Sequence, residues 1–420
     1  MLTHPILTAA AQAGIRLGHE KFRAFLASHQ SASLETPAIH IAGTNGKGST
    51  TAFASQILKE ANISSGSYTS PHLIEVNERI MVNKAPISDE NLSRQLETIK
   101  SAATKWTGAH ADDTEVPLTF FELMTASALC HFNDLKLAIN VIEVGLGGRL
   151  DSTNIVNSVV SVITSIGFDH MDVLGDDLAS IASEKSGIIR QNIPVVVGQL
   201  PQEAMRIVRM IAHEKDAPLY VLGVDFYMHP NEDNTWNFVW GERSIENLEL
   251  GLLGLHQGSN AALAIMALLL VPTLQLPARI IREGVLNAHH PGRLEWLSDN
   301  ILLDCAHNID GAHTLAAYLK SHPKAQRRTL LLGASEDKDI RAVAVSLQPY
   351  FDRILTTHCA HPRAMSAGDV AKSISGLDIP VFSAGPVESI FDYVDPDTEE
   401  IVVAGSIFLV GALRAIYASK

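Results

Sequence analysis

The sequence predicts an α/β protein in two parts: a three-layer domain with a mostly parallel central sheet over residues 1–290, and a smaller α/β domain over residues 291–420. Three observations predict this architecture. Short unbroken apolar runs, typical of buried parallel strands, alternate with longer segments of helical periodicity. A glycine-rich turn follows the first of these runs. The chain is also, at 420 residues, too long for one typical domain.

The glycine-rich turn lies in residues 39–50, which read IHIAGTNGKGST: a short strand, the turn and the start of an amphipathic helix. Glycines let backbone N–H groups close around an anion, the helix N-terminus adds partial positive charge, and Lys47 adds a full charge. This arrangement suits a polyphosphate, and Ser49 and Thr50 place hydroxyls where a P-loop offers a magnesium ligand. The glycine spacing is a variant of the usual P-loop, and an ordinary tight turn is the alternative. We therefore predict a P-loop NTPase-type domain that holds a nucleotide with its metal.

The other elements of the first domain follow from periodicity. Residues 1–37 have a helical pattern that Pro37 ends, and residues 73–88 form a long polar loop with a hairpin-like end, either functional or a plain surface excursion. The helix from Leu118 is apolar nearly all round, which predicts a core helix. The remaining segments are the strands IPVVVG and PLYVLG, a β-rich stretch through WNFVW and a buried helix around Asn260.

Polar residues follow three further strands of this domain. Ser70 ends the run SGSYTS, Glu143 closes the run LAINVIEV, and His170 comes shortly after SVVSVITSI. Ligands bind at the carboxyl ends of strands in open α/β sheets, and we expect Glu143 and His170 to converge from neighbouring strands. A buried carboxylate needs a metal or a basic partner, although one that caps the next loop is the alternative. A histidine is an unusual ligand for magnesium, which prefers oxygen.

Three other motifs allow a plainer interpretation. Gly145 and Gly147 resemble the start of a dinucleotide fingerprint, but Leu150 occupies the third glycine position and no helix follows, so we reject NAD binding. Lys185 lies in the last turn of the helix DDLASIASEKSG, where the helix dipole alone favours a cation. The motif HCAHPR at residues 358–363 lacks a second ligand cluster, and we interpret it as a loop.

Composition limits the partners. The formal net charge of −14 argues against a nucleic-acid-binding surface. The three scattered cysteines fit reduced thiols, and no secretory segment opens the chain. The most apolar run, residues 261–271, is too short to cross a membrane. We expect a cytoplasmic monomer that acts on small molecules, without nucleic-acid or membrane partners.

The second domain begins close to residues 291–293. Five apolar runs alternate there with helical segments such as GAHTLAAYL and FLVGALRAIYAS, which predicts a Rossmann-like parallel α/β fold. The five runs are NILLDCA, RTLLLGA, RILTTHC, PVFSA and IVVAGS.

Together these segments resemble the Mur ligase superfamily, and within it the folylpolyglutamate synthases that also act as dihydrofolate synthases. The resemblance spans nearly the whole chain, in the family's order. The matching segments are GTNGKGST, TSPHL with NERI, LTFFE, EVGLGGRLDSTN, ITSIGFDHMDVLG, EKSGI, HQGSNAALA, HPGRLE, DCAHN and the AGS of residues 404–406.

The resemblance implies an ATP-dependent ligase that adds L-glutamate to dihydropteroate and to tetrahydrofolates through an acyl phosphate. It implies ATP contacts from Asn45, Gly46, Lys47, Gly48, Ser49, Asn260, Arg293 and Asp304, and two magnesium ions, with Ser70, Glu143 and His170 as ligands. It implies a pteridine-substrate pocket lined by Leu118, Thr119, Phe120, Phe121, Leu150, Asp151 and Ser152, and glutamate contacts from His307 and Ser406. Lys47, Lys185 and His170 would be catalytic. Lys185 matches the lysine that the family carbamylates, a reaction that needs a neutral amine.

Three alternatives remain. The protein could be a folylpolyglutamate synthase only, or a related ligase that joins amino acids to a nucleotide-linked cell-wall precursor, although LTFFE and RLDSTN speak against the latter. It could also be a nucleotide-switched binding module without ligase activity, in which Glu143, His170 and Lys185 are structural.

Overall fold

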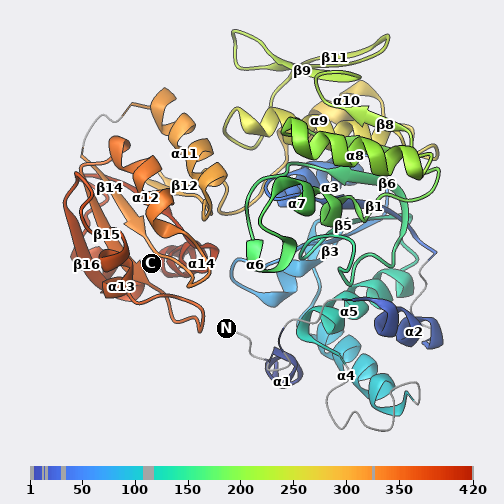
Figure 1. The fold of residues 1–420 in the computed structure, drawn as a ribbon, viewed down its shortest axis with the longest axis horizontal. Coiled ribbons are helices and arrows are strands. Elements are labelled where there is room, and N and C mark those ends of the chain that lie inside the picture. Colours follow the sequence, from blue (N-terminus) through green and yellow to red (C-terminus); the bar gives the residue numbers. More distant parts are fainter. Residues whose placement is uncertain are drawn as a thin grey trace. The chain divides into compact units, whose positions relative to one another are not determined.

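The structure is a computed structural model that describes residues 4–11, 14, 18–29, 35–106, 118–323 and 327–418. The chain forms two compact units (Figure 1). One contains the chain up to residue 251 together with residues 257–289, and the other contains residues 252–256 and 290–420. The prediction of a mostly parallel α/β sheet with a separate C-terminal α/β unit is confirmed.

The larger unit is built on an eight-stranded sheet with the order β4-β3-β2-β5-β1-β6-β7-β8. All neighbours from β2 to β8 pair in parallel, whereas β3 and β4 form an antiparallel edge. The strands are β1 (Pro37–Ala42), β2 (Ser65–Tyr68), β3 (Ile80–Val82), β4 (Ala85–Pro86), β5 (Ile139–Glu143), β6 (Asn157–Ile163), β7 (Val195–Val197) and β8 (Leu219–Val221). A separate antiparallel sheet contains β9 (Phe226–Pro230), β10 (Trp236–Trp240) and β11 (Arg243–Leu248).

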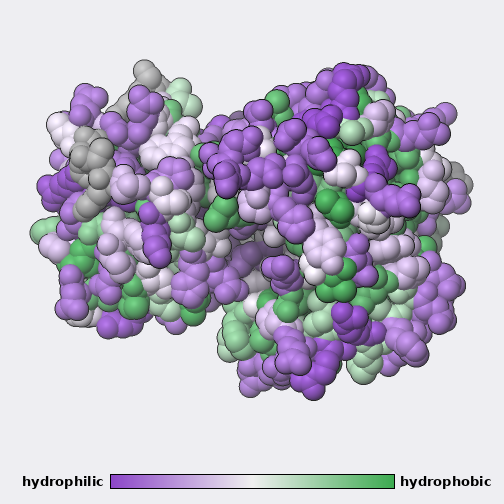
Figure 2. All heavy atoms as spheres, turned by 90° about the horizontal axis from the view of Figure 1, so that it is seen from above, coloured by the Kyte–Doolittle hydropathy of each residue, from purple (hydrophilic) through white to green (hydrophobic). Residues whose placement is uncertain are grey.

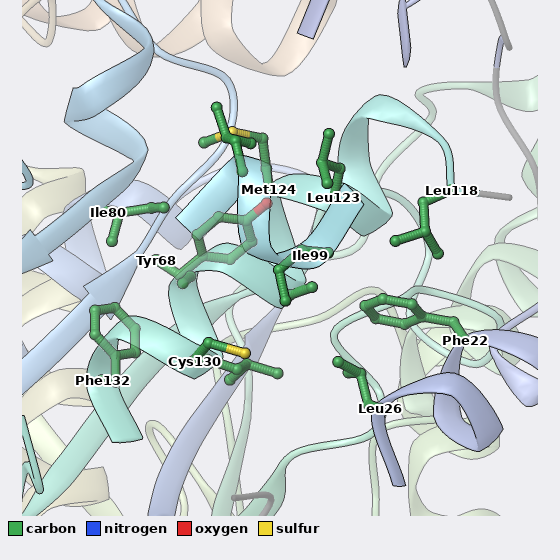
Figure 3. Close-up of a cluster of buried hydrophobic side chains, with 14 of the residues drawn as sticks. Phe22, Leu26, Tyr68, Ile80, Ile99, Leu118, Leu123, Met124, Cys130 and Phe132 are labelled. Atoms are coloured by element: carbon green, nitrogen blue, oxygen red, sulfur yellow. The ribbon is translucent and has the colours of Figure 1, made fainter. Parts of the chain in front are cut away.

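The helices of this unit cover both faces of the large sheet (Figure 1). They are α1 (Pro5–Ala11), α2 (Glu20–Ser28), α3 (Lys47–Glu60), α4 (Asp89–Lys105), α5 (Phe120–Asp134), α6 (Met171–Leu174), α7 (Leu178–Ser186), α8 (Gln202–Glu214), α9 (His256–Leu269) and α10 (Ala278–Leu286), with the 3-10 helix η1 (Val76–Arg79). Side chains of α1, α2, α4 and α5 form one continuous apolar core with β2 and β3. Figure 3 shows part of this core, including Tyr68, Met124 and Phe132.

Helix α5 illustrates how local sequence sets an element. The Thr119 hydroxyl accepts a hydrogen bond from the N–H of Glu122, and the Glu122 carboxylate accepts one from the N–H of Thr119. This reciprocal capping box satisfies two N–H groups that have no partner within the helix. The helix is buried along most of its length, as its apolar sequence predicts.

Two sequence-based expectations for this unit are wrong. Glu143 and His170 do not follow neighbouring strands, because β1 lies between β5 and β6. Sheet order depends on distant pairings that the runs themselves do not encode. The helix after the glycine-rich turn is also buried on nearly every side, rather than amphipathic, because α3 is covered by the sheet and by α10. Parts of the predicted helical segment at residues 1–37 lie outside the described residues.

The smaller unit has a six-stranded sheet with the order β12-β13-β17-β14-β15-β16. Its strands are β12 (Glu295–Ser298), β13 (Ile301–Leu303), β14 (Arg328–Leu332), β15 (Arg353–His358), β16 (Val381–Pro386) and β17 (Glu400–Ala404). Its helices are α11 (Ile309–Ser321), α12 (Ile340–Leu347), α13 (Ala367–Ser373) and α14 (Ile407–Ala418), with the 3-10 helices η2 (Gln348–Tyr350) and η3 (Val387–Asp392). The five predicted strands are confirmed, and the antiparallel edge strand β12 is an addition.

Polar side chains dominate the face shown in Figure 2. Figure 2 shows hydrophilic side chains over most of the visible face, with hydrophobic ones scattered among them. In the part of the chain that the structure describes, no helix has the length and apolar character needed to cross a membrane.

Candidate active site

The glycine-rich turn joins β1 to α3, and the helix begins at Lys47. Gly46 caps the helix in the left-handed region, with φ of 87°, a conformation that glycine adopts without strain. The first N–H groups of a helix have no partner one turn earlier, so the loop presents donors and partial positive charge together. The Lys47 ammonium donates to the carbonyl oxygens of Gly43, at 3.0 Å, and Thr44, at 3.3 Å.

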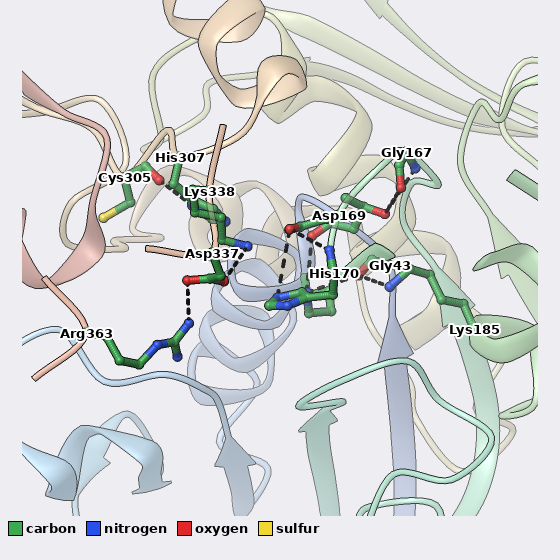
Figure 4. A network of polar contacts seen from close by, with 12 residues as sticks. Gly43, Gly167, Asp169, His170, Lys185, Cys305, His307, Asp337, Lys338 and Arg363 are labelled. Atoms are coloured by element: carbon green, nitrogen blue, oxygen red, sulfur yellow. Dashed lines mark hydrogen bonds and ion pairs between the residues drawn. The ribbon is translucent and has the colours of Figure 1, made fainter. Parts of the chain in front are cut away.

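Three charged groups converge beside this turn. Lys185, from the end of α7, donates from Nζ to the same Gly43 carbonyl at 3.1 Å (Figure 4). Lys47 Nζ lies 4.0 Å from Oε1 of Glu143, the last residue of β5. Burial lowers the pKa of Lys185 to about 7, and the charge of Lys47 contributes in the same direction. The site therefore holds a buried lysine that can be neutral at physiological pH.

Helix α9 supports the turn from behind. Asn260 donates from Nδ2 to Gln257 Oε1 at 2.8 Å, and Gln257 Nε2 lies 3.4 Å from the Ser49 hydroxyl. A Cβ added to Gly46 would lie 2.4 Å from Asn260 Oδ1, so only glycine allows this approach. The Thr50 hydroxyl is buried and has no hydrogen-bond partner among the described residues.

The predicted metal ligands follow strands whose carboxyl ends share one edge of the sheet. Ser70 follows β2, Glu143 ends β5, and His170 follows β6 in the left-handed region, with φ of 50°. The His170 N–H donates to Asp169 Oδ1 at 3.0 Å. Within the described ranges, no group of three or more His, Cys, Asp and Glu residues could hold a metal by itself.

The donor set nevertheless suits a nucleotide-bound magnesium ion. Such an ion takes one or two protein carboxylates and completes its shell with phosphate oxygens and water. Glu143 supplies a buried carboxylate and Ser70 a hydroxyl, both at the edge of the sheet where the glycine-rich turn lies. The residues present therefore fit this ion.

The predicted pteridine-substrate segments meet around the start of α5. The ring of Phe121 lies over Gly145, where a Cβ would be 2.4 Å from Cζ, and its centroid is 5.9 Å from that of Tyr68. The guanidinium of Arg79 lies 5.0 Å from the centroid of Phe120 and is almost fully buried. Sequence reasoning missed Arg79, whose only signal was its place in the NERI segment.

Asp151 organises the neighbouring loop. Its Oδ2 accepts from the N–H of Leu146 at 2.8 Å, and its Oδ1 accepts from the N–H of Thr153 at 2.9 Å and from the Thr153 hydroxyl. His40 Nε2 lies 2.9 Å from that same hydroxyl, beneath the loop. Burial raises the pKa of Asp151, and these hydrogen bonds oppose that shift. The carboxylate thus fixes the loop that carries Leu150.

Three predicted residues of the smaller unit, Asp304, His307 and Ser406, follow β13 and β17, which are parallel neighbours, whereas Arg293 precedes β12. Asp304 accepts from the N–H groups of Leu294, at 3.0 Å, and Ala306, at 2.9 Å. Burial raises the pKa of Asp304, whereas the charge of Arg293 lowers it. His307 Nδ1 lies 2.9 Å from the Cys305 carbonyl (Figure 4).

The smaller unit also contains an ion pair between Asp337 and Arg363 that was not predicted from sequence, beside Ser406, which was. Asp337 Oδ1 accepts from Arg363 at 2.8 Å, and Asp337 Oδ2 lies 3.5 Å from Lys338 Nζ (Figure 4). The Ser406 hydroxyl, after β17, is buried and has no hydrogen-bond partner in the described parts of the chain. An orphaned buried hydroxyl of this kind is a potential ligand contact.

Known proteins resemble this chain along its whole length. The Mur ligase middle domain matches residues 41–268, and the Mur ligase glutamate ligase domain matches residues 292–407. A dihydrofolate synthase/folylpolyglutamate synthase of Bacillus subtilis (strain 168) is 34% identical over 98% of this chain and 94% of its own length.

Two solved structures are similar in fold and sequence. Escherichia coli FolC in complex with DHPP and ADP has a TM-score of 0.89 and 31% identity, covering 99% of this chain and 98% of that one. A bifunctional folylpolyglutamate synthase/dihydrofolate synthase from Yersinia pestis, complexed with AMPPNP and Mn ion, has a TM-score of 0.85 and 31% identity, covering 98% of each chain.

Proposed function

This chain belongs to the Mur ligase family, within its dihydrofolate synthase/folylpolyglutamate synthase branch, and from this premise we propose which of its residues carry out the ligation. The protein is an ATP-dependent ligase that joins glutamate to folates. The observation that carries the residue assignment is the meeting of Lys47 and Lys185 at the Gly43 carbonyl, with Glu143 beside them.

The reaction must activate a carboxylate, which is a poor electrophile. Transfer of the γ-phosphoryl group of ATP to the carboxylate of the acceptor gives an acyl phosphate and ADP. The amine of glutamate then attacks the acyl carbon, the C–O bond to phosphate breaks, and the amine loses a proton. We propose that both dihydropteroate and tetrahydrofolates serve as acceptors.

Residues 45–49 would hold the triphosphate, with helix N–H groups donating to phosphate oxygens. Lys47 would exchange its contacts with the Gly43 and Thr44 carbonyls for the terminal phosphate, where its charge stabilises the transfer. Asn260 would contact the nucleotide, supported by its place against Gly46. The family resemblance supports nucleotide contacts from Arg293 and Asp304, and glutamate contacts from His307 and Ser406, whose hydroxyl is without a partner among the described residues.

Ser70, Glu143 and His170 would hold the magnesium ions that accompany ATP, and we propose two such ions. Bound magnesium screens the repulsion between triphosphate and carboxylate. Lys47 lies 4.0 Å from the Glu143 carboxylate and balances part of its buried charge when no cation is bound.

Lys185 would carry a carbamate, which exchanges a cation for an anion at this site. The neutral amine attacks CO2, forms an N–C bond and releases a proton. Burial supports the proposal, since it brings the pKa of Lys185 down to about 7 and so makes the neutral amine available. Direct donation to the Gly43 carbonyl places that amine next to the phosphate loop.

The pteridine-bearing substrate would bind between the start of α5 and the loop around Leu150 and Ser152. The aromatic rings of Phe120 and Phe121 offer flat apolar surface to a planar heterocycle. Asp151 would contribute by holding the loop in shape, because its oxygens already accept hydrogen bonds from Leu146 and Thr153. Leu118 and Thr119 complete this side of the pocket.

The test of the phosphate-loop assignment is the Lys47→Ala variant. It should keep the wild-type unfolding midpoint and lose glutamate ligation. Lys59→Ala, at the exposed far end of the same helix, is the matched control and should ligate normally. Ligation by Lys47→Ala at a rate close to wild type would contradict the assignment.

A further inference from the structure

We infer that Thr164 and Ser165, which directly follow β6, are positioning residues that hold the phosphate loop in its nucleotide-binding shape. The inference rests on the proposed function, because it concerns the same loop. Neither residue belongs to the segment that would contact the phosphates. Both act on the loop through the backbone of Asn45: Ser165 hydrogen-bonds to its N–H and its carbonyl, and Thr164 to its carbonyl.

The contacts are direct. Ser165 Oγ accepts a hydrogen bond from the N–H of Asn45 at 2.9 Å and donates to the Asn45 carbonyl at 3.0 Å. Thr164 Oγ1 donates to the same carbonyl at 2.6 Å. The N–H of Thr44 donates to the Ser165 carbonyl at 2.9 Å, which joins the two loops again one residue earlier. Four hydrogen bonds therefore connect the end of β6 to two consecutive residues of the turn.

Gly43, the first glycine of the turn, has no side chain, and this leaves room for the Thr164 hydroxyl. A Cβ on Gly43 would lie 1.9 Å from the Thr164 hydroxyl oxygen, closer than any two such atoms can approach. Thr164 is buried, with 6% of its surface exposed, so its side chain has no room to move aside. The close approach of Thr164 to the turn thus requires a glycine at position 43.

The contacts also decide which groups can meet a phosphate. The N–H of Asn45 is engaged by Ser165, so anion binding falls to the N–H groups of residues 46–49 at the start of α3. Without the hydroxyls of Thr164 and Ser165, the backbone at Asn45 could rotate. The N–H groups of residues 46–49 would then lose their fixed geometry. Preorganised donors bind an anion more strongly than mobile ones, because no ordering is needed on binding.

The experiment compares Ser165→Ala and Thr164→Val with Ser161→Ala. Ser161 lies on β6 itself and is fully buried, but its hydroxyl donates to the Ile188 carbonyl at 2.8 Å, away from the turn. Calorimetry would give the Kd of each protein for AMPPNP with magnesium and, separately, for dihydropteroate. Thermal unfolding would report stability.

Ser165→Ala removes two hydrogen bonds to Asn45 and Thr164→Val removes one. Each variant should therefore weaken AMPPNP binding by about 3- to 10-fold or more, the factor expected for the loss of one neutral hydrogen bond. Dihydropteroate binding should not change, Ser161→Ala should bind AMPPNP like wild type, and Thr164→Ser should restore most of the affinity. Amide hydrogen exchange over residues 43–50 should be faster in Ser165→Ala and Thr164→Val than in Ser161→Ala. This difference should remain even if Ser161→Ala lowers the stability of the protein as much as the two loop variants do.

Two results would overturn the inference: unchanged AMPPNP affinity and exchange in both loop variants, or equal weakening of both ligands, which indicates a general structural role. Wild-type protein that binds no AMPPNP would instead remove the proposed function, and the inference with it.

Discussion

Replacing Lys185 by alanine should abolish ligation without unfolding the protein, and a short carboxylic acid should restore part of the activity. Lys185 has a pKa of about 7 in the folded protein, mainly because it is buried. At pH 7.5 that value leaves roughly three-quarters of the amine neutral, against roughly 0.1% for a free lysine with a pKa of ~10.4. Burial therefore increases the form that reacts with CO2 by nearly three orders of magnitude.

The sign of the pH dependence follows from the lowered pKa. Between about 7 and the ordinary lysine value, the unfolded chain binds more protons than the folded one, so protein without carbamate gains stability as the pH rises through this window. At a fixed partial pressure of CO2, carbamate formation should decline as the pH falls below 7, because the amine becomes protonated.

The assay is glutamate ligation by Lys185→Ala with and without acetate or propionate. Wild type should not respond to the acid. Lys105→Ala is the matched control, since Lys105 is also a last-turn lysine but is exposed, and its loss should leave ligation unchanged. Wild-type activity in Lys185→Ala would refute a catalytic role, and failure of every short carboxylate to rescue it would count against the carbamate.

Two further predictions concern stability and binding. Gly46→Ala places a Cβ 2.4 Å from Asn260 Oδ1 at a φ of 87°, so it should lower the free energy of unfolding in urea by about 1–3 kcal/mol and weaken AMPPNP binding. Gly376→Ala is the control: its φ is 79° and nothing lies near the added Cβ, so it should show the backbone strain without the clash. Equal AMPPNP affinity in the two variants would contradict this account. Burial, with a smaller contribution from Arg190, lowers the pKa of His40 to about 3, so the unfolded chain binds the extra proton and stability should fall between pH 6.5 and pH 3 by up to about 5 kcal/mol. In His40→Gln the free energy of unfolding should fall less over this pH range than in wild type. Equal losses in the two proteins would show that other groups cause the acid destabilisation.

Local sequence predicted the elements that carry the site. The glycine-rich turn, the carboxylate at the end of β5 and the lysine at the end of α7 each leave a signal within one short segment. The partners of these groups are not local. Lys185 meets the Gly43 carbonyl 142 positions away, and Arg79 meets Phe120 across the chain. Such pairings depend on sheet order, which no single segment specifies.

The same limit explains two other differences. A lysine at a helix C-terminus is ordinarily explained by the helix dipole, and only its burial distinguishes Lys185 from Lys105. Strand β12 has four half-buried residues and no apolar run, because it pairs only along one edge of its sheet. Neither burial nor edge pairing can be read from a single segment.

The decisive measurement is phosphate release from ATP and magnesium, with dihydropteroate or with tetrahydrofolate, each with and without L-glutamate. We expect turnover that depends on glutamate with both acceptors. Slow phosphate release that ignores glutamate and both acceptors would contradict this expectation.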